Sequence, residues 1–266
     1  MMYLSKIINL FRIKFAQSLN YLYYLSSINV FRYLANIIIY GASLEMEGIK
    51  FYLSSPSDVA EVRPEYEKTV FIYMLKVIHI LCGNSNSICM FIDVGAHIGV
   101  HALRIARSCP NCLVLAIEPN PSCYRMLTRA IKSSRINNVH AINAGLSDMD
   151  GYGTLCIKPI TATSSFVELS NCYNTMQVPV LQLDTLMRFI TQFIPYDRLK
   201  VVIKIDVEGA ELKVLRGAAL TLRALMPILF IEVRERNLKD FKRFMDDMDY
   251  KCQRIYEENW MCVAKG

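Results

Sequence analysis

The stretch that decides the fold reads CMFIDVGAHIGVHALRIA and covers residues 89–106. Its first part is a short apolar run, which is typical of a buried strand, and its last part has apolar residues at helical spacing. Gly95 and Gly99 lie between the two parts. Glycine suits such a turn because a side chain would block the close approach of the backbone to a ligand, and the free N–H groups of a helix start bind anions. We therefore predict a strand, a ligand-binding loop and a helix.

The same alternation of apolar runs and helical patterns continues along the chain. Runs rich in Ile and Val recur at residues 89–94, 113–118, 139–143, 201–206 and 228–233. Short apolar runs that alternate with helices are typical of a parallel sheet buried on both faces. We predict an α/β fold with a doubly wound, Rossmann-type, mostly parallel sheet.

Two segments depart from this alternation. Residues 151–158 and 178–183 predict extra strands between the third and fourth core strands, with TATSSF at 161–166 between them. Residues 251–256 and 260–264 predict an antiparallel hairpin that closes the C-terminal end of the sheet.

The first 44 residues differ in character from the rest, since they contain four basic residues and no acidic one. Their polar residues recur at helical spacing beside a broad apolar face. We predict a helical N-terminal extension over residues 1–47 and one α/β domain over residues 48–266. The apolar face either caps this domain or lies on a membrane surface with its basic residues at the headgroups. The charge-free run at 15–31 is marginal as a membrane span.

Composition sets broad limits on the function. A chain of 266 residues that is 53% hydrophobic is not mainly disordered. The formal net charge of +6 is mild, and no run of Lys and Arg concentrates it, so we predict no nucleic-acid partner.

The nine cysteines are an odd number, and no cleavable signal peptide is evident. Both observations favour reduced thiols and a cytoplasmic location, peripheral on the inner membrane face if the N-terminal extension binds a membrane. Cys109 and Cys112, in the motif CPNC, are either ordinary thiols near a helix end, a redox dithiol or half of a zinc site. No second pair with ligand spacing follows, and we expect ordinary thiols.

The residues around the glycine loop favour a carboxylate ligand over a phosphate. The GxxxG spacing lacks the GxGxxG dinucleotide fingerprint, and no Lys-Ser or Lys-Thr follows as in a P-loop. Asp93 would repel a pyrophosphate but can accept hydrogen bonds from the ammonium of a methionine moiety. Glu118, at the end of the next strand, is placed to accept both hydroxyls of a ribose. The alternative is that the glycines merely form a turn and that Asp93 caps the helix.

A second group of carboxylates follows two later strands. Asp206 ends the strand in VVIKIDVEGAELKVLRGA, Glu208 follows it, and Glu232 in PILFIEV occupies the same place on the next strand. The carboxyl ends of parallel strands meet at one edge of a sheet, so we expect these three acids to line one cleft. A carboxylate there can act as a general base, and the sequence leaves Asp206 and Glu208 as alternatives.

Simpler roles for these acids stay open. Acidic residues in a first helical turn stabilise the helix dipole, which accounts for Glu211, and Lys204 is able to pair with one of the acids. A trio of carboxylates also suits a divalent ion, but nothing in the sequence demands one and we predict no metal. His97 and His101 flank Gly99 and either line the site or pack.

These motifs resemble the FkbM-type S-adenosylmethionine-dependent methyltransferases. The resemblance rests on FIDVGAHIG, AIEPNP, AINAGLSDMDG, VPVLQLDTL and, most specifically, KIDVEGAELKVLRGA followed by PILFIEV, in that order. It covers about residues 48–264. It implies a class I methyltransferase fold, S-adenosylmethionine as the cofactor, and a hydroxyl of a sugar, glycolipid or secondary metabolite as the methyl acceptor.

The resemblance also implies roles for individual residues. The cofactor would be bound by Asp93, Gly95, Ala96, His97, Gly99 and Glu118, with Asn143 near its adenine. Asp206 and Glu208 would face the transfer site. The usual loop reads DVGANIG, so His97 replaces an asparagine here.

Two other functions stay open: a cofactor-binding module without catalysis, and an NAD(P)-dependent oxidoreductase, which the loop spacing disfavours. The sequence identifies neither the acceptor nor the oligomeric state.

Overall fold

The structure is a computed structural model that describes residues 39–83, 87–158, 164, 166, 172 and 174–265. Most of the helical extension predicted for residues 1–47 therefore lies outside the described residues.

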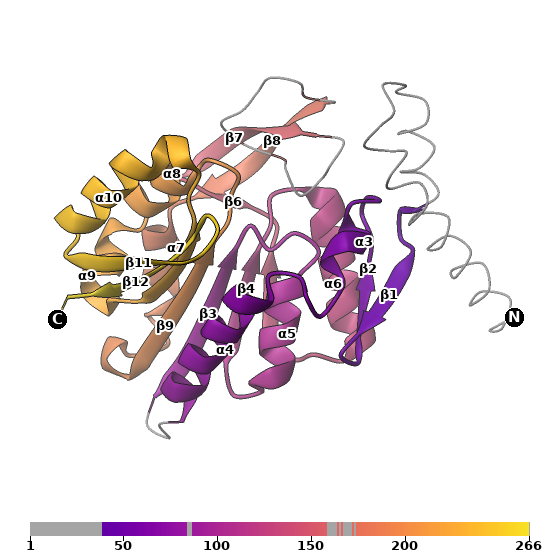
Figure 1. The fold of residues 1–266 in the computed structure, drawn as a ribbon, viewed down its shortest axis with the longest axis horizontal. Helices are drawn as coiled ribbons and strands as arrows, with labels where there is room; N and C mark the ends of the chain where they lie inside the picture. Colours follow the sequence, from indigo (N-terminus) through magenta and orange to yellow (C-terminus); the bar gives the residue numbers. More distant parts are fainter. Residues whose placement is uncertain are drawn as a thin grey trace, which may run out of the picture.

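A seven-stranded sheet forms the centre of the molecule (Figure 1), in the order β11-β12-β10-β9-β3-β4-β5. Its strands are β3 (Ile88–Val94), β4 (Leu113–Ile117), β5 (Val139–Ile142), β9 (Leu199–Ile205), β10 (Ile228–Glu232), β11 (Tyr250–Tyr256) and β12 (Asn259–Ala264). The strands from β10 to β5 are parallel, whereas β12 runs antiparallel to β10 and β11. The predicted class I methyltransferase-like fold and its closing hairpin are confirmed.

The order of the strands determines where a ligand can bind. From β3 the chain moves outward through β4 and β5, and it later returns to place β9 on the other side of β3. In an open parallel sheet, the crevice at such a reversal lies at the carboxyl ends of the strands. We therefore expect the site beyond the ends of β3 and β9.

Helices cover both faces of the sheet because successive strand side chains point to opposite sides. In β3, Phe91 packs in one apolar cluster, whereas Met90 and Ile92 pack in the other. The first cluster includes side chains of α4 (Lys68–Cys82), α5 (Val100–Ser108) and α6 (Pro121–Ser134). The second includes side chains of α7 (Leu183–Ile190), α8 (Glu211–Arg216), α9 (Ala219–Leu225) and α10 (Leu238–Asp247).

Smaller elements lie around this core. A hairpin of β1 (Ser43–Met46) and β2 (Ile49–Tyr52) packs against α6, and the predicted domain boundary falls in its turn. The predicted extra strands form a separate sheet in the order β6-β8-β7. The remaining elements are α3 (Asp58–Glu61), β6 (Gly145–Leu146), β7 (Gly151–Ile157), β8 (Asn174–Leu181), η2 (Tyr196–Arg198) and η3 (Glu235–Asn237).

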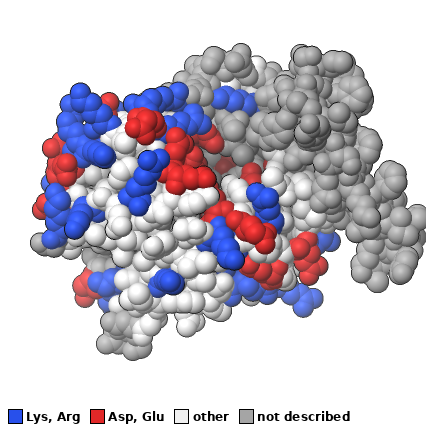
Figure 2. All heavy atoms as spheres, in the orientation of Figure 1, with Lys and Arg blue, Asp and Glu red and all other residues white. Residues whose placement is uncertain are grey.

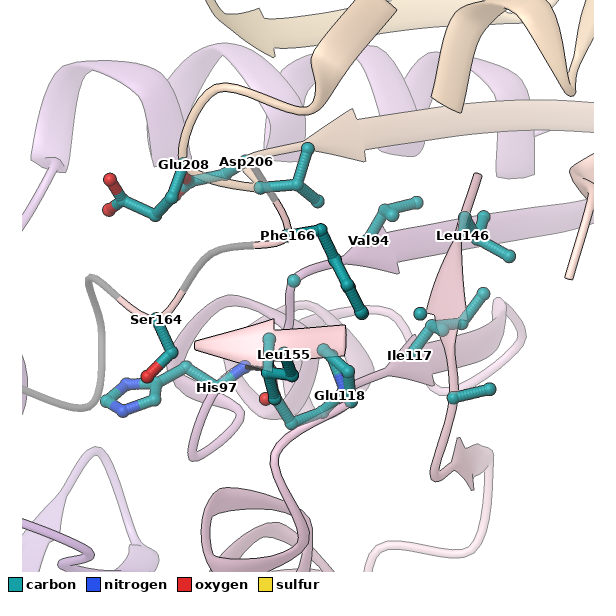
Figure 3. A pocket seen from close by; sticks show the side chains of 15 residues that line it. Val94, His97, Ile117, Glu118, Leu146, Leu155, Ser164, Phe166, Asp206 and Glu208 are labelled. Carbon is teal, nitrogen blue, oxygen red and sulfur yellow. Dashed lines mark hydrogen bonds between the residues drawn. The ribbon is translucent and has the colours of Figure 1, made fainter. Parts of the chain in front are cut away.

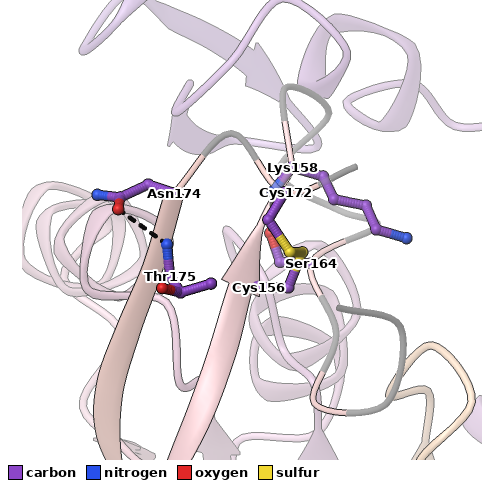
Figure 4. The surroundings of a disulfide bond; sticks show 6 residues. All are labelled: Cys156, Lys158, Ser164, Cys172, Asn174 and Thr175. Atoms are coloured by element: carbon purple, nitrogen blue, oxygen red, sulfur yellow. Dashed lines mark hydrogen bonds between the residues drawn. A yellow bond between two sulfur atoms is a disulfide. The ribbon is translucent and has the colours of Figure 1, made fainter. Parts of the chain in front are cut away.

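Two disulfides correct the expectation of reduced cysteines. Cys252 and Cys262 are direct partners in the β11–β12 register and are bonded to each other. Cys156 of β7 is bonded to Cys172, which lies shortly before β8 (Figure 4). The expectation failed because spacing in the sequence does not reveal which cysteines strand pairing brings together. The other five cysteines, including Cys109 and Cys112, form no disulfide.

No helix among the described residues is long and apolar enough to cross a membrane. The two predicted roles of the N-terminal extension, a cap on the domain or a contact with a membrane, stay predictions.

Gly217 offers a test of how tightly the helices pack on the small sheet. A Cβ at this position would lie 1.9 Å from the carbonyl oxygen of Ser147, although φ of Gly217 is an ordinary −72°. We expect Gly217→Ala to lower the free energy of unfolding by about 3 kcal/mol, because the backbone must move to relieve the clash. Urea denaturation of the full chain measures this change.

Gly48→Ala is the matched control. Gly48 has a φ of +72°, but a Cβ there would meet no atom within 4 Å, so only backbone strain of about 1 kcal/mol is expected. An equal effect of the two substitutions would contradict the packing argument.

Candidate active site

The loop after β3 lies directly against the loop after β9. The N–H of Asp206 donates a hydrogen bond to the carbonyl oxygen of Val94 at 3.0 Å. Gly95 has a φ of +84°, and a Cβ there would lie 1.9 Å from the carbonyl oxygen of Asp206. Only glycine satisfies both conditions. The glycine loop and the DVEGAE segment are thus held together at the edge where the fold predicts a ligand.

Gly99 serves helix packing. It precedes α5 with a φ of +90°, and a Cβ there would lie 2.4 Å from a methyl carbon of Leu127 in α6. The residue therefore lets α5 approach α6 closely, and it does not line either of the cavities described below.

The two carboxylate oxygens of Asp93 differ in their hydrogen bonding. Its Oδ2 accepts a hydrogen bond from the N–H of Ala102 at 3.1 Å, so the carboxylate does cap α5. Its Oδ1 is buried and has no hydrogen-bond partner among the described residues. Burial raises the pKa of Asp93, and the nearby charges of Lys204 and His101 oppose this rise. A buried acceptor without a partner is costly, and an ammonium group would satisfy it.

Glu118 is oriented by two backbone amides. Its Oε2 accepts the N–H of His97 at 2.8 Å, and its Oε1 accepts the N–H of Asn120 at 2.7 Å. Burial raises the pKa of Glu118, while His97 and the two amides oppose the rise. Each oxygen of a carboxylate has a second lone pair, so the fixed group is able to accept both hydroxyls of a ribose. Together with Asp93 and Gly95, it fits S-adenosylmethionine.

His97 departs from the usual loop sequence, and its ring has its own partners. Nδ1 lies 2.9 Å from Oε2 of Glu61, and Nε2 lies 3.6 Å from Oδ1 of Asp58. Burial alone would lower the pKa of His97, but its acidic neighbours, Glu61 foremost, raise it well above the ordinary value. The imidazolium thus ties the loop to α3, while the backbone N–H positions Glu118.

Two cavities open at this edge of the sheet. The first has a volume of about 520 Å³ and is flanked by Glu118 and Glu208; Figure 3 shows Phe166 pointing into it. The second has a volume of about 700 Å³. Both volumes include space that is open to solvent. The residues that line both cavities are Gly95, His97, Asp206 and Glu208.

The second cavity is rich in carboxylates. Glu61, Asp93, Asp206, Glu208 and Glu232 line it, and Figure 2 shows acidic side chains gathered near the centre of this face. The predicted trio thus does lie in one cleft.

Lys204 is the buried cation of this cavity, and its Nζ lies 2.9 Å from Oδ2 of Asp206. Burial alone would lower the pKa of Lys204, but Asp206, Glu67 and Asp93 outweigh burial and raise it. The lysine therefore stays charged and holds Asp206, as one of the simpler alternatives predicted.

Glu208 and Glu232 differ in how readily they ionise. Burial and the charge of Asp206 raise the pKa of Glu208 to about 7, although its ion pair with Arg234 opposes the rise. Asp206 and burial raise the pKa of Glu232 to about 9. Glu208 also has a φ of +55°, an uncommon conformation that is often found at functional sites. Glu211 instead accepts the N–H of Gly209 at 2.7 Å and does not line the cavities.

Asn143 lies beside the first cavity without lining it. Its amide donates to the carbonyl oxygens of Glu118 at 2.8 Å and of Pro119 at 3.2 Å. The amide thus supports the loop that carries Glu118, and its place near an adenine stays a prediction. Ala96 lines the second cavity.

Sequence reasoning missed the part of the site that precedes α4. Nε2 of His101 lies 2.7 Å from Oε2 of Glu67. Burial opposes ionisation of Glu67, but His101 and Lys204 outweigh it and lower the pKa to about 2. Tyr66 lines the second cavity next to Glu61. The only signal was the polar character of residues 61–67, which points to no particular chemistry.

Comparisons with known proteins agree with the motifs. The family model described as "Methyltransferase FkbM domain" matches residues 93–252. "Methyltransferase sdnD" of Sordaria araneosa is 30% identical over 154 residues, which cover 47% of this chain and 59% of that protein. "Methyltransferase 1" of Beauveria bassiana is 26% identical over 141 residues, which cover 47% and 57%. The chain thus spans less than two thirds of the length of these relatives.

Similarity to solved structures is weaker. M. jannaschii TYW2 in complex with AdoMet has 18% identity and a TM-score of 0.40, with 84% of this chain and 83% of that chain covered. This score is too low to support an argument. The family match, in contrast, includes the glycine loop, Glu118 and the DVEGAE segment and covers more than half of the chain. The chain therefore belongs to the FkbM family of S-adenosylmethionine-dependent methyltransferases.

Proposed function

We propose that this chain transfers a methyl group from S-adenosylmethionine to a hydroxyl of a sugar, a glycolipid or a secondary metabolite. The observation that carries the proposal is the wall shared by the two cavities, formed by Gly95, His97, Asp206 and Glu208. A donor held by Glu118 in the first cavity and by Asp93 in the second would present its methyl group to an acceptor in the second cavity. Such positioning supplies several kcal/mol of a reaction barrier.

Glu208 in the second cavity supports a hydroxyl as the acceptor. Once ionised, its carboxylate only accepts hydrogen bonds, so it matches a group that donates one, as a hydroxyl does. S-adenosylmethionine, when bound, supplies an electrophilic methyl group. The proton of the acceptor hydroxyl must then leave, and we assign it to the carboxylate of Glu208. A base with a pKa of about 7 suits neutral pH.

If Glu118 binds the ribose of the donor, the substitution Glu118→Gln should weaken binding of the cofactor. An amide has one acceptor oxygen in place of two, so one hydroxyl of the ribose loses a hydrogen bond to a charged group. We expect S-adenosylhomocysteine to bind about 10- to 100-fold more weakly, as measured by isothermal titration calorimetry. The matched control is Glu235→Gln, at an exposed position on η3. Wild-type affinity in Glu118→Gln would contradict the assignment.

The proposed base predicts a loss of rate in Glu208→Gln. We expect transfer to fall by about 10² to 10⁴-fold, since a general base contributes that much. The assay incubates the chain and methyl-labelled S-adenosylmethionine with free sugars, methyl glycosides and glycolipids, and it follows label in the product. Glu211→Gln, in the same turn but outside both cavities, should keep the wild-type rate. Cofactor binding without transfer to any acceptor would favour the module without catalysis.

The pH dependence gives a test of the same base without a substitution. Glu208 acts only when it is ionised, so kcat/KM should be constant above pH 7 and fall about tenfold for each unit below it. The slope should disappear in Glu208→Gln. A rate that rises as the pH falls through 7 would mean that the reaction needs Glu208 protonated.

A further inference from the structure

Four of the five free cysteines gather at the amino edge of the sheet, opposite the active site. Cys82 ends α4, Cys89 lies near the start of β3, and Cys109 and Cys112 lie between α5 and β4. The sulfur atoms of Cys82, Cys89 and Cys112 all lie within 4.8 Å of one another. Despite this proximity, none of the three forms a disulfide.

Cys109 belongs to the same group. It is buried, and the thiols of Cys82 and Cys89 lie near enough to interact with it. The turn between Cys109 and Cys112 closes with a hydrogen bond from the N–H of Cys112 to the carbonyl oxygen of Cys109 at 2.9 Å. The tight turn therefore holds Cys109 close to Cys112, whose sulfur lies within 4.8 Å of those of Cys82 and Cys89.

A side-chain amide fixes this turn. Nδ2 of Asn138 lies 3.1 Å from the carbonyl oxygen of Ala106, 3.3 Å from that of Cys109 and 2.9 Å from that of Cys112. These carbonyls come from the end of α5 and from the CPNC turn. The positions of the two cysteines are thus set by the fold, which lowers the cost of ordering them around an ion.

The chemistry of the cluster fits a soft divalent cation. The thiols of Cys89 and Cys112 are buried, and that of Cys82 is partly buried at the end of α4. A bound soft cation displaces the protons of thiols and forms thiolates.

The spacing of the sulfurs also fits zinc. Zn–S bonds of about 2.3 Å in a tetrahedron place the sulfurs about 3.8 Å apart. The three sulfurs all lie within 4.8 Å of one another, a limit about 1 Å longer than this spacing.

We propose that Cys82, Cys89, Cys109 and Cys112 form a structural Zn²⁺ site at the amino edge of the sheet. Binding would form four Zn–S bonds and release the thiol protons to solvent, with no change in oxidation state. The ion would join α4, β3, α5 and the start of β4. Asp93 and Glu118 lie at the other ends of β3 and β4. The zinc site would therefore be separate from the proposed methyl-transfer site.

Metal analysis of the full chain tests the site. The chain is purified with zinc present and without chelators, and its metal content is measured by inductively coupled plasma mass spectrometry. We expect one zinc ion per chain, and loss of that ion in Cys89→Ser and in Cys112→Ser. Cys123→Ser is the matched control, because Cys123 is a buried free thiol outside the cluster, and it should keep the ion.

Cobalt titration of the metal-free wild type keeps the proposal testable if a serine variant fails to fold. Tetrahedral cobalt with four thiolates shows intense thiolate-to-metal charge transfer and strong d–d bands, and both should saturate at one ion per chain. Any of four results would overturn the proposal: no bound zinc together with no cobalt bands, iron in place of zinc, full zinc content in Cys89→Ser, or a disulfide within the cluster.

Discussion

The contact between Gly95 and the carbonyl oxygen of Asp206 is the constraint on which the site depends. It brings two loops that are far apart in the sequence to a distance that no side chain at Gly95 would allow. Glu118 and Glu208 line one of the cavities at this contact, and Asp93, Glu208 and Glu232 line the other. The close approach of two backbones therefore turns a general crevice of parallel sheets into two adjoining cavities.

The carboxyl groups of the site also differ in how readily they ionise. Lys204 forms an ion pair with Asp206, and the charge of Asp206 makes Glu208 and Glu232 harder to ionise. Glu208, which also contacts Arg234, is affected less than Glu232. The ion pair between Lys204 and Asp206 thus gives Glu208 and Glu232 different pKa values. Such a difference is typical of acid–base chemistry in enzymes.

The sequence predicted what depends on local pattern. Alternating apolar runs indicated the parallel sheet, and because parallel strands share an edge, Asp206, Glu208 and Glu232 were expected together. Tertiary contacts could not be predicted from the sequence. Glu61 and Glu67 come from the segment before α4 and join the site only because His97 and His101 of the next crossover contact them. The bond between Cys252 and Cys262 likewise depends on strand register, which spacing alone does not give.

The C-terminal hairpin also bears on how the molecule behaves at high concentration. Its outer strand β11 is one edge of the central sheet, and an open edge can pair with a strand of another molecule. This edge exposes Lys251, Gln253 and Arg254, and its pairing with β12 is irregular between Arg254 and Tyr256. At the opposite edge, β5 has only four residues. Charge, irregularity and shortness thus discourage edge-to-edge aggregation at both borders of the sheet.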